Sequence, residues 1–132
     1  YGCFDFERGP TRQIWVGAGI GITPFIARMK QLARLPGAKP IDLIHPTAVA
    51  DEAALAKLRA DAQAAGIRLH LLVDARGDAR LSGESLRQLL PDWAQAGLWF
   101  CGPVGLGQAL RRDLLAHGLA ERDFHQELFQ MR

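Results

Sequence analysis

The sequence predicts an α/β fold of three layers, in which a roughly five-stranded parallel sheet is covered by helices on both faces. Short apolar segments typical of buried strands alternate along the whole chain with segments of helical periodicity. The segment at residues 98–101 has no polar position, as expected for a strand buried on both faces. A chain of 132 residues with 48% hydrophobic and 23% charged residues is large enough to bury such a sheet as one domain.

The first half of the chain predicts two strand-helix units. Residues 14–17 form an apolar strand, and residues 24–34 form a helix whose apolar side chains recur at helical spacing: Phe25, Met29 and Leu32. Residues 41–45 form a second apolar strand, which Pro46 is expected to stop. A second helix is expected to begin after its cap, Asp51, and to end near a glycine, with an apolar face made of Leu55, Leu58 and Ala62.

The second half predicts three further strands. Residues 67–73 form the third strand, and Ser82 is expected to cap a short helix that carries Leu86, Leu89 and Leu90 before Pro91. Residues 98–101 form the fourth strand, and residues 124–129 form the last. The mixed polarity of the last segment is typical of an edge strand. The helix between them has apolar residues at helical spacing: Leu106, Leu110 and Leu114.

Composition excludes several classes of function. With 16 basic and 14 acidic residues, the net charge of +2 and the scattered arginines give no face for a nucleic acid. Cys3 and Cys101 form no CxxC pair and the histidines have no metal-binding spacing, so no metal site and no disulfide framework is expected. The most apolar stretch, residues 14–27, is interrupted by polar and helix-breaking residues and is too short to span a bilayer.

The strongest functional signal is the turn that follows the first strand. It contains three alternating glycines, Gly17, Gly19 and Gly21, whose lack of a side chain lets the backbone turn tightly and approach a bulky ligand. Thr23 is expected to cap the next helix, and Pro24 suits its first position. The amides and the dipole at a helix N-terminus favour a phosphate. The segment therefore predicts a site for the pyrophosphate of a dinucleotide.

The glycine turn alone is also consistent with a purely structural role. A tight turn from strand to helix needs glycine whether or not a ligand binds there. Ile22 stands where the GxGxxG fingerprint has its last glycine, and no acid follows the second strand, so an ordinary NAD dehydrogenase is disfavoured. If the first and fourth strands are neighbours, the glycine loop and the turn at residues 101–103 border one crevice at the sheet edge.

Three separated motifs together resemble one known family, the ferredoxin-NADP reductase superfamily. They are Gly19-Ile20-Gly21-Ile22-Thr23-Pro24, Phe100-Cys101-Gly102-Pro103 and Phe124-His125-Gln126-Glu127-Leu128-Phe129. Within it, the chain is most similar to the NAD(P)H-binding half of a ferric-reductase-like transmembrane component, a relative of NADPH oxidases. The resemblance implies a single NAD(P)H-binding domain over residues 1–132 of a longer flavoprotein, with residues 1–12 as the linker from a flavin-binding domain.

The resemblance also implies roles for individual residues. The pyrophosphate would lie on the glycine loop, at Gly17, Gly19, Ile20, Gly21, Thr23 and Pro24. Cys101, with Gly102 and Pro103, would lie beside the nicotinamide carbon that donates hydride, in a positioning role. Glu127 would help to order the site, and the ring of Phe129 would pack against the flavin. Phe129 is followed by three more residues, in contrast to the terminal aromatic of many relatives.

The choice of nucleotide rests on the turn after the third strand. NADPH-using relatives have a Ser-Arg pair there, whereas this chain has Asp74-Ala75-Arg76. Arg76 suits the 2′-phosphate of NADPH, and Asp74 suits the free ribose hydroxyl of NADH, so NADH is favoured over NADPH.

The resemblance further implies FAD in a missing upstream domain, haem in a missing membrane domain, and a position on the cytoplasmic side of a membrane. Two alternative functions stay open. One is a dinucleotide-binding sensor without redox chemistry, which would not need Cys101 or Glu127. The second is an S-adenosylmethionine-dependent methyltransferase, which would need an acidic ribose ligand that the sequence lacks.

Overall fold

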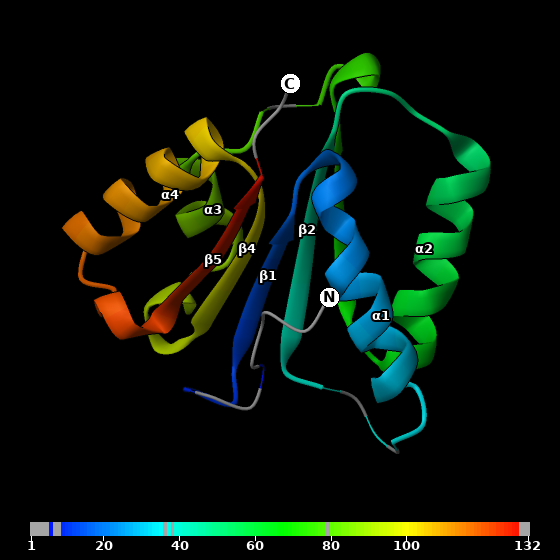
Figure 1. Cartoon of the computed structure of the whole chain (residues 1–132), viewed down its shortest axis with the longest axis horizontal. Helices are drawn as coiled ribbons and strands as arrows, with labels where there is room; N and C mark the ends of the chain where they lie inside the picture. Colours follow the sequence, from blue (N-terminus) through cyan, green and yellow to red (C-terminus); the bar gives the residue numbers. More distant parts are fainter. Residues whose placement is uncertain (1–5, 7–8, 36, 38, 79, 130–132) are drawn as a thin grey trace.

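The computed structural model has one sheet of five parallel strands in the order β3-β2-β1-β4-β5, which confirms the predicted three-layer α/β fold (Figure 1). It describes residues 6, 9–35, 37, 39–78 and 80–129, without the side chains of residues 128 and 129. The strands are β1 (Gln13–Gly17), β2 (Ile41–Thr47), β3 (Arg68–Val73), β4 (Gly97–Pro103) and β5 (Phe124–Phe129). The α-helices are α1 (Thr23–Leu32), α2 (Glu52–Ala65), α3 (Gly83–Leu89) and α4 (Val104–Ala116).

Short 3₁₀ turns connect these elements at four places within the described residues. They are η1 (Gly19–Ile22), η2 (Asp74–Arg76), η3 (Trp93–Gln95) and η4 (Glu121–Asp123). The first two follow the carboxyl ends of β1 and β3, so both lie at the edge of the sheet where a ligand is expected.

The predicted helix ends are confirmed where capping residues mark them. The Asp51 carboxylate accepts a hydrogen bond from the Ala54 amide at 3.2 Å, and Gly66 ends α2 in the left-handed conformation at φ 72°. Ser82 caps α3 through a reciprocal capping box with Ser85. These local signals mark where the helices begin and end.

One expectation about local structure is wrong. Strand β2 continues through Pro46 to Thr47, because the β1 ladder ends at Ile44 and β2 pairs beyond that point with β3 alone. A proline is tolerated in such a one-sided pairing. Helix α3 carries Leu86 and Leu89 as predicted, with Leu86 fully buried and Leu89 42% exposed, and Leu90 is its C-cap residue.

The core consists of two layers, one on each face of the sheet. Helices α1 and α2 cover one face, where Trp15, Trp99 and Phe25 are fully buried. Helices α3 and α4 cover the other, where Val16 and Phe100 are fully buried (Figure 1). Since side chains alternate along each strand, β1 and β4 contribute to both layers. The fourth strand is interior and the fifth lies at the edge, as predicted.

A buried carboxylate joins the elements at the amino end of the sheet. Asp42 on β2 is fully buried, forms ion pairs with Arg12 at 2.9 Å and Arg68 at 2.8 Å, and is hydrogen-bonded to the His70 Nε2 at 2.6 Å. Arg12 also pairs with Asp92 at 2.8 Å, before β4. This network ties together the starts of four strands, at the end of the sheet opposite the glycine turn.

Candidate functional site

The predicted crevice lies where the order of the strands reverses. Strands β1 and β4 are neighbours, and their register runs to Gly17 and Cys101 at the carboxyl edge. The Ala18 amide then donates to the Cys101 carbonyl at 3.0 Å, which joins the glycine turn to the Cys-Gly-Pro turn. The chain leaves β1 toward α1 on one face and leaves β4 toward α4 on the other, so the two turns border a crevice.

The three glycines of the turn have different physical roles. A Cβ on Gly17 would lie 2.9 Å from the Ile22 Cα and from the Phe25 ring, so this glycine lets the turn pack on α1. A Cβ on Gly21 would lie 2.1 Å from the Cys101 carbonyl oxygen. Gly19 alone of the three has a positive φ, 57°, and has open space beside it. Gly19 is therefore the glycine that leaves room for a ligand.

The expected capping role of Thr23 is wrong. Thr23 is the first residue of α1, and its hydroxyl donates to the Ile20 carbonyl at 3.1 Å, while Pro24 takes the second helical position. The reason is the 3₁₀ turn η1, which uses the residues before Thr23 and makes Ile22 the N-cap. Thr23 and Ile20 are exposed at the sheet edge, and Ile20 keeps 71% of its surface accessible.

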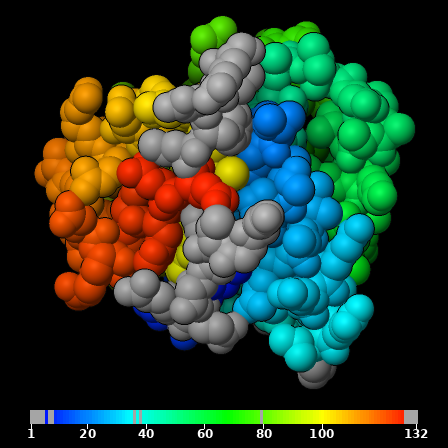
Figure 2. All heavy atoms as spheres, viewed as in Figure 1, coloured from blue at the N-terminus to red at the C-terminus, as the bar shows by residue number. Residues whose placement is uncertain are grey.

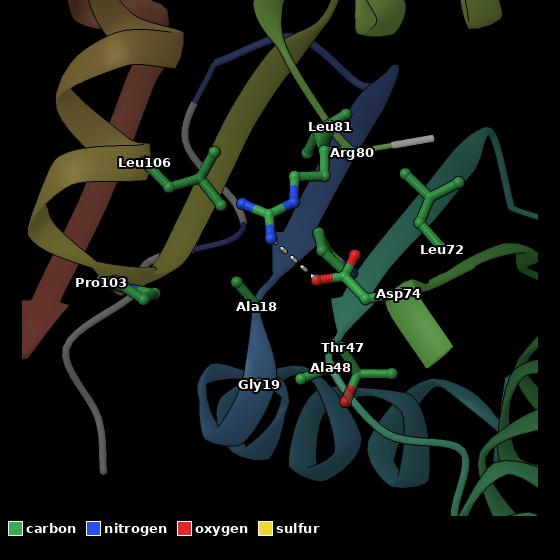
Figure 3. A pocket seen from close by; sticks show the side chains of 11 residues that line it. Ala18, Gly19, Thr47, Ala48, Leu72, Asp74, Arg80, Leu81, Pro103 and Leu106 are labelled. Carbon is green, nitrogen blue, oxygen red and sulfur yellow. Dashed lines mark ion pairs between the residues drawn. The ribbon is translucent and has the colours of Figure 1, made fainter. Parts of the chain in front are cut away.

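A cavity of about 400 Å³ opens at this carboxyl edge. Its lining comes from the ends of four strands and the segments that follow them: Ala18 and Gly19 after β1; Pro46, Thr47 and Ala48 at β2; Leu72 and Asp74 at β3; and Pro103 and Leu106 at β4 and α4, with Arg80 and Leu81 from the segment before α3. Figure 3 shows these side chains around the open space. Three residues predicted from the sequence line it, namely Gly19, Asp74 and Pro103.

The two arginines near the third strand point in different directions. Arg76 forms an ion pair with Glu52 on α2 and is not part of the cavity lining. Arg80 lines the cavity, is 87% exposed, and lies 3.8 Å from the Asp74 carboxylate. Figure 3 shows its guanidinium group reaching toward Asp74 in the space bordered by Ala18 and Leu106. The cation beside the cavity is thus Arg80, which the sequence motif does not indicate.

A buried histidine lies beside the glycine turn. His45, near the end of β2, is 7% exposed, and its Nδ1 is 2.6 Å from the Gly17 carbonyl oxygen. Burial lowers the pKa of His45 below its ordinary value, although the hydrogen bond with Gly17 acts in the opposite direction. The ring therefore stays neutral near pH 7, with its Nδ1 hydrogen donated to the carbonyl.

Cys101 and Glu127, which are expected beside the nicotinamide, lie on the face of the sheet opposite the cavity wall. Cys101 is 6% exposed within the core layer of Trp15 and Trp99, and its register partner on β5 is Glu127, which is partly buried. Register partners in a parallel pair share a face, so the two side chains lie side by side. In Figure 2 a small yellow area, in the colour that the bar gives to residues near 100, lies between red β5 and the blue part of the chain.

Phe129 and Gly102 are two further residues expected at the site. The backbone of Phe129 pairs with Pro103, while its side chain lies outside the described part of the chain. Gly102 is buried, and a Cβ there would lie 2.9 Å from the Ala18 Cβ.

Within the described residues, no cluster of three or more potential metal ligands occurs, and none of the helices is long and apolar enough to cross a membrane.

Sequence reasoning missed most of the cavity wall. Leu72 on β3 and Leu106 on α4 have the spacing of core residues, and Leu81 lies in the segment before α3, although each borders the cavity. Thr47 and Ala48 had one available signal, since they follow a parallel strand at the edge where ligands bind. The sequence contains no such signal for Arg80, because the position of its side chain depends on the path of the chain after η2.

Comparison with known proteins supports the same family. The chain is 32% identical over 127 residues to a protein named NADPH oxidoreductase from Mycobacterium tuberculosis (strain ATCC 25618 / H37Rv), covering 93% of the chain and 32% of that protein. It thus spans about a third of the length of this curated relative. No protein-family model matches the chain.

Two solved structures illustrate the likeness in fold. The flavohaem-like FAD/NAD-binding domain of nitric oxide dioxygenase from Vibrio cholerae O1 biovar El Tor superposes with a TM-score of 0.77 at 23% identity, covering 96% of this chain and 54% of that one. Ferredoxin-NADP⁺ reductase from Plasmodium falciparum superposes with a TM-score of 0.68 at 16% identity, covering 90% and 52%. These likenesses show that the chain has the fold of ferredoxin-NADP⁺ reductase-like domains, in agreement with the resemblance of the three sequence motifs.

Proposed function

We propose that this domain holds NAD(P)H in the cavity at the carboxyl edge and presents its nicotinamide to FAD bound by another domain of the same protein. The observation that carries the proposal is the cavity itself, because it lies at the reversal of strand order and is bordered by both sequence motifs. Hydride transfer from nicotinamide to flavin is the chemistry that the two bound cofactors supply. The chain's own work is binding and orientation.

The cavity lining suits the adenosine end of a dinucleotide. Its volume of about 400 Å³ lies within the range of roughly 300–1,000 Å³ typical of small-molecule sites. Leu72, Leu81 and Leu106 offer an apolar wall to a base, while Thr47 and Asp74 offer oxygen atoms to ribose hydroxyls. A wall that is mostly apolar with a few polar groups is the usual composition of such a site.

The pyrophosphate has a matching place between the two turns. Helices α1 and α4 both begin at this edge, and within the described residues no side chain caps either N-terminus by a hydrogen bond. The dipoles of both helices favour a negative charge there, while the Thr23 amide already donates to the Ile20 carbonyl and Pro24 has no N–H. Gly19, with no side chain and open space around it, allows the phosphates to approach the backbone. In this proposal the phosphates contact the loop at the main chain of Gly19.

We propose NADPH as the nucleotide, in place of the NADH preference expected from Asp74. Arg76 is paired with Glu52, but Arg80 reaches the cavity on a long and exposed side chain. Its contact with Asp74 is at 3.8 Å, so it can turn toward a 2′-phosphate and bind it with two parallel hydrogen bonds. The relative named NADPH oxidoreductase agrees with this choice.

At the other end, Cys101 and Glu127 are proposed to position the nicotinamide. Both lie on the face of β4 and β5 opposite the cavity wall, so a bound dinucleotide would cross the carboxyl edge between Gly19 and Pro103. Cys101 is buried and small, and it would set how deeply the ring enters without forming a covalent bond. Phe129 would shield the flavin.

A finer proposal follows from the sequence resemblance to ferric-reductase-like proteins. In that version the full-length protein is a ferric-reductase-type enzyme with a transmembrane haem domain, and this domain lies on the cytoplasmic side. Expression of the full-length gene tests it through the haem absorption spectrum of the membrane fraction. Full-length protein without haem would leave a flavin-dependent NADPH oxidoreductase of another type.

Nucleotide binding by the chain itself is the direct test of the main proposal. Amide spectra recorded during titration with NADPH and then with NADH should show shifts at Ala18, Gly19 and Thr47. Residues at the amino end of the sheet, such as Asp42, serve as the internal control and should not shift. If none of the cavity residues responds at millimolar NADPH, the proposal is wrong.

A further inference from the structure

Strands β1 and β2 separate one residue before β1 ends. Their register stops at Val16 and Ile44, whereas β1 continues to pair with β4 up to Gly17, and β2 continues to pair with β3 up to Thr47. The separation opens the cavity between the segment after β1 and the end of β2. Because the strands part here, the Gly17 carbonyl needs a hydrogen-bond donor from outside the β1–β2 ladder.

The side chain of His45 takes the place of the missing ladder bond. Its Nδ1 lies 2.6 Å from the Gly17 carbonyl oxygen, and the ring is 7% exposed. A carbonyl can only accept, so Nδ1 carries the hydrogen. The lowered pKa, caused by burial, agrees with a neutral ring in this position. His45 therefore fixes the last residue of β1 across the gap that the two strands leave.

We propose that His45 is a positioning residue of the nucleotide cavity, holding the Gly17-Ala18-Gly19 turn at a fixed distance from the Pro46-Thr47 wall. The inference rests on the proposed function, since it assigns a role to the cavity as a nucleotide site. Both sides of the cavity follow directly from the bonded pair: Ala18 and Gly19 continue from Gly17, and Pro46 continues from His45.

Loss of this hydrogen bond leaves a buried carbonyl without its partner and lets the turn move. Since binding through backbone amides depends on their orientation, we expect a Kd for NADPH that is roughly tenfold higher. The effect on the turn is also visible without nucleotide. The Ala18 amide donates to Cys101 and the Gly21 amide donates to Ala18, so their hydrogen exchange reports whether the turn stays closed.

Two substitutions separate the hydrogen bond from the packing of the ring. In His45→Asn, the side-chain nitrogen is the same number of bonds from Cα as Nδ1, so the donor is kept and the ring is lost. In His45→Phe, a ring of similar size is kept and the donor is lost. Each variant is measured as the whole chain, with its thermal midpoint recorded, so that a general loss of folding is recognised and separated from loosening of the turn.

The experiment combines NADPH titration with hydrogen exchange in the absence of nucleotide. We expect His45→Phe to raise the Kd about tenfold and to speed exchange at Ala18 and Gly21, and His45→Asn to stay within about threefold of the wild type. Equal weakening by both variants, or unchanged exchange in His45→Phe, overturns the inference and leaves the proposed function intact. If the wild type binds no nucleotide, both the proposed function and the inference are wrong.

Discussion

The role of Arg80 gives the sharpest prediction, because the chain supplies its own control. Arg80→Gln removes the charge that lines the cavity, while Arg76→Gln removes a charge earlier in the same segment that is paired with Glu52. Both arginines follow β3, and both variants keep a long polar side chain. If the cavity binds the 2′-phosphate through Arg80, only the first substitution should alter the preference between NADPH and NADH.

The size of the effect follows from the exposure of Arg80. At 87% exposure the guanidinium group is surrounded by water, where two unit charges about 4 Å apart attract each other by about 1 kcal/mol. A phosphate monoester carries a charge of about −1.5 to −2 at pH 7. Arg80→Gln should therefore lower the binding free energy of the 2′-phosphate by about 1.5–2 kcal/mol. This corresponds to a decrease of roughly 10- to 30-fold in the NADP⁺ to NAD⁺ affinity ratio.

Calorimetric titration of the chain with NADP⁺ and NAD⁺ measures this ratio for the wild type and both variants. The NAD⁺ affinity should change little in Arg80→Gln, and high salt should reduce the wild-type ratio because it screens the exposed charge. Asp74→Asn should raise the ratio, since it removes the negative charge 3.8 Å from Arg80. An unchanged ratio in Arg80→Gln, or an equal decrease in Arg76→Gln, would refute the assignment.

Three further predictions concern stability and are checked by denaturant unfolding. Gly21→Ala should lower the free energy of unfolding by more than about 3 kcal/mol, because its Cβ meets the Cys101 carbonyl. Gly19→Ala should lower it by only about 1–2 kcal/mol, because of the left-handed conformation alone. Similar losses in the two variants would contradict this. Asp42→Asn should lower the free energy of unfolding by about 2–3 kcal/mol, a value reduced because its partner Arg68 is exposed. A loss below about 1 kcal/mol would argue against the network. His45 has a lowered pKa, so its contribution is complete above pH 6.5 and decreases below it. The stability difference between wild type and His45→Asn should narrow from pH 7 to pH 5, and a widening difference would contradict the shift.

Much of the fold could be predicted because its signals are local. Asp51, Gly66 and Ser82 mark helix ends through bonds to residues only a few positions away, so the sequence contains both partners of each interaction. The five strands were located by apolar runs, and their parallel arrangement follows from the helices between them. Pro46 misled the prediction because the end of the β1 ladder, which makes it tolerable, is a property of another strand.

The site could be predicted only in part, because its geometry depends on contacts that are not local in the sequence. The glycine loop was recognisable, but the direction of each side chain around it depends on contacts between distant segments. Arg76 turns to Glu52 on α2, and Gly77 reverses the chain at φ 81°, after which Arg80 returns to the cavity. The sequence gives no sign of a role for His45, because its partner is a backbone carbonyl on another strand.

The glycine turn and the Cys-Gly-Pro turn form one structural unit. Gly21 faces the Cys101 carbonyl, and Gly102 faces the Ala18 Cβ, so each turn has a glycine at the point where it meets the other. A side chain at either position would push β1 and β4 apart at the edge where the Ala18 amide bonds to Cys101. The glycine spacing therefore serves mainly to join the two turns, and Gly19 alone is left to face a ligand. This contact explains why the Gly-Ile-Gly and Cys-Gly-Pro segments occur together, although 80 positions separate Gly21 from Cys101.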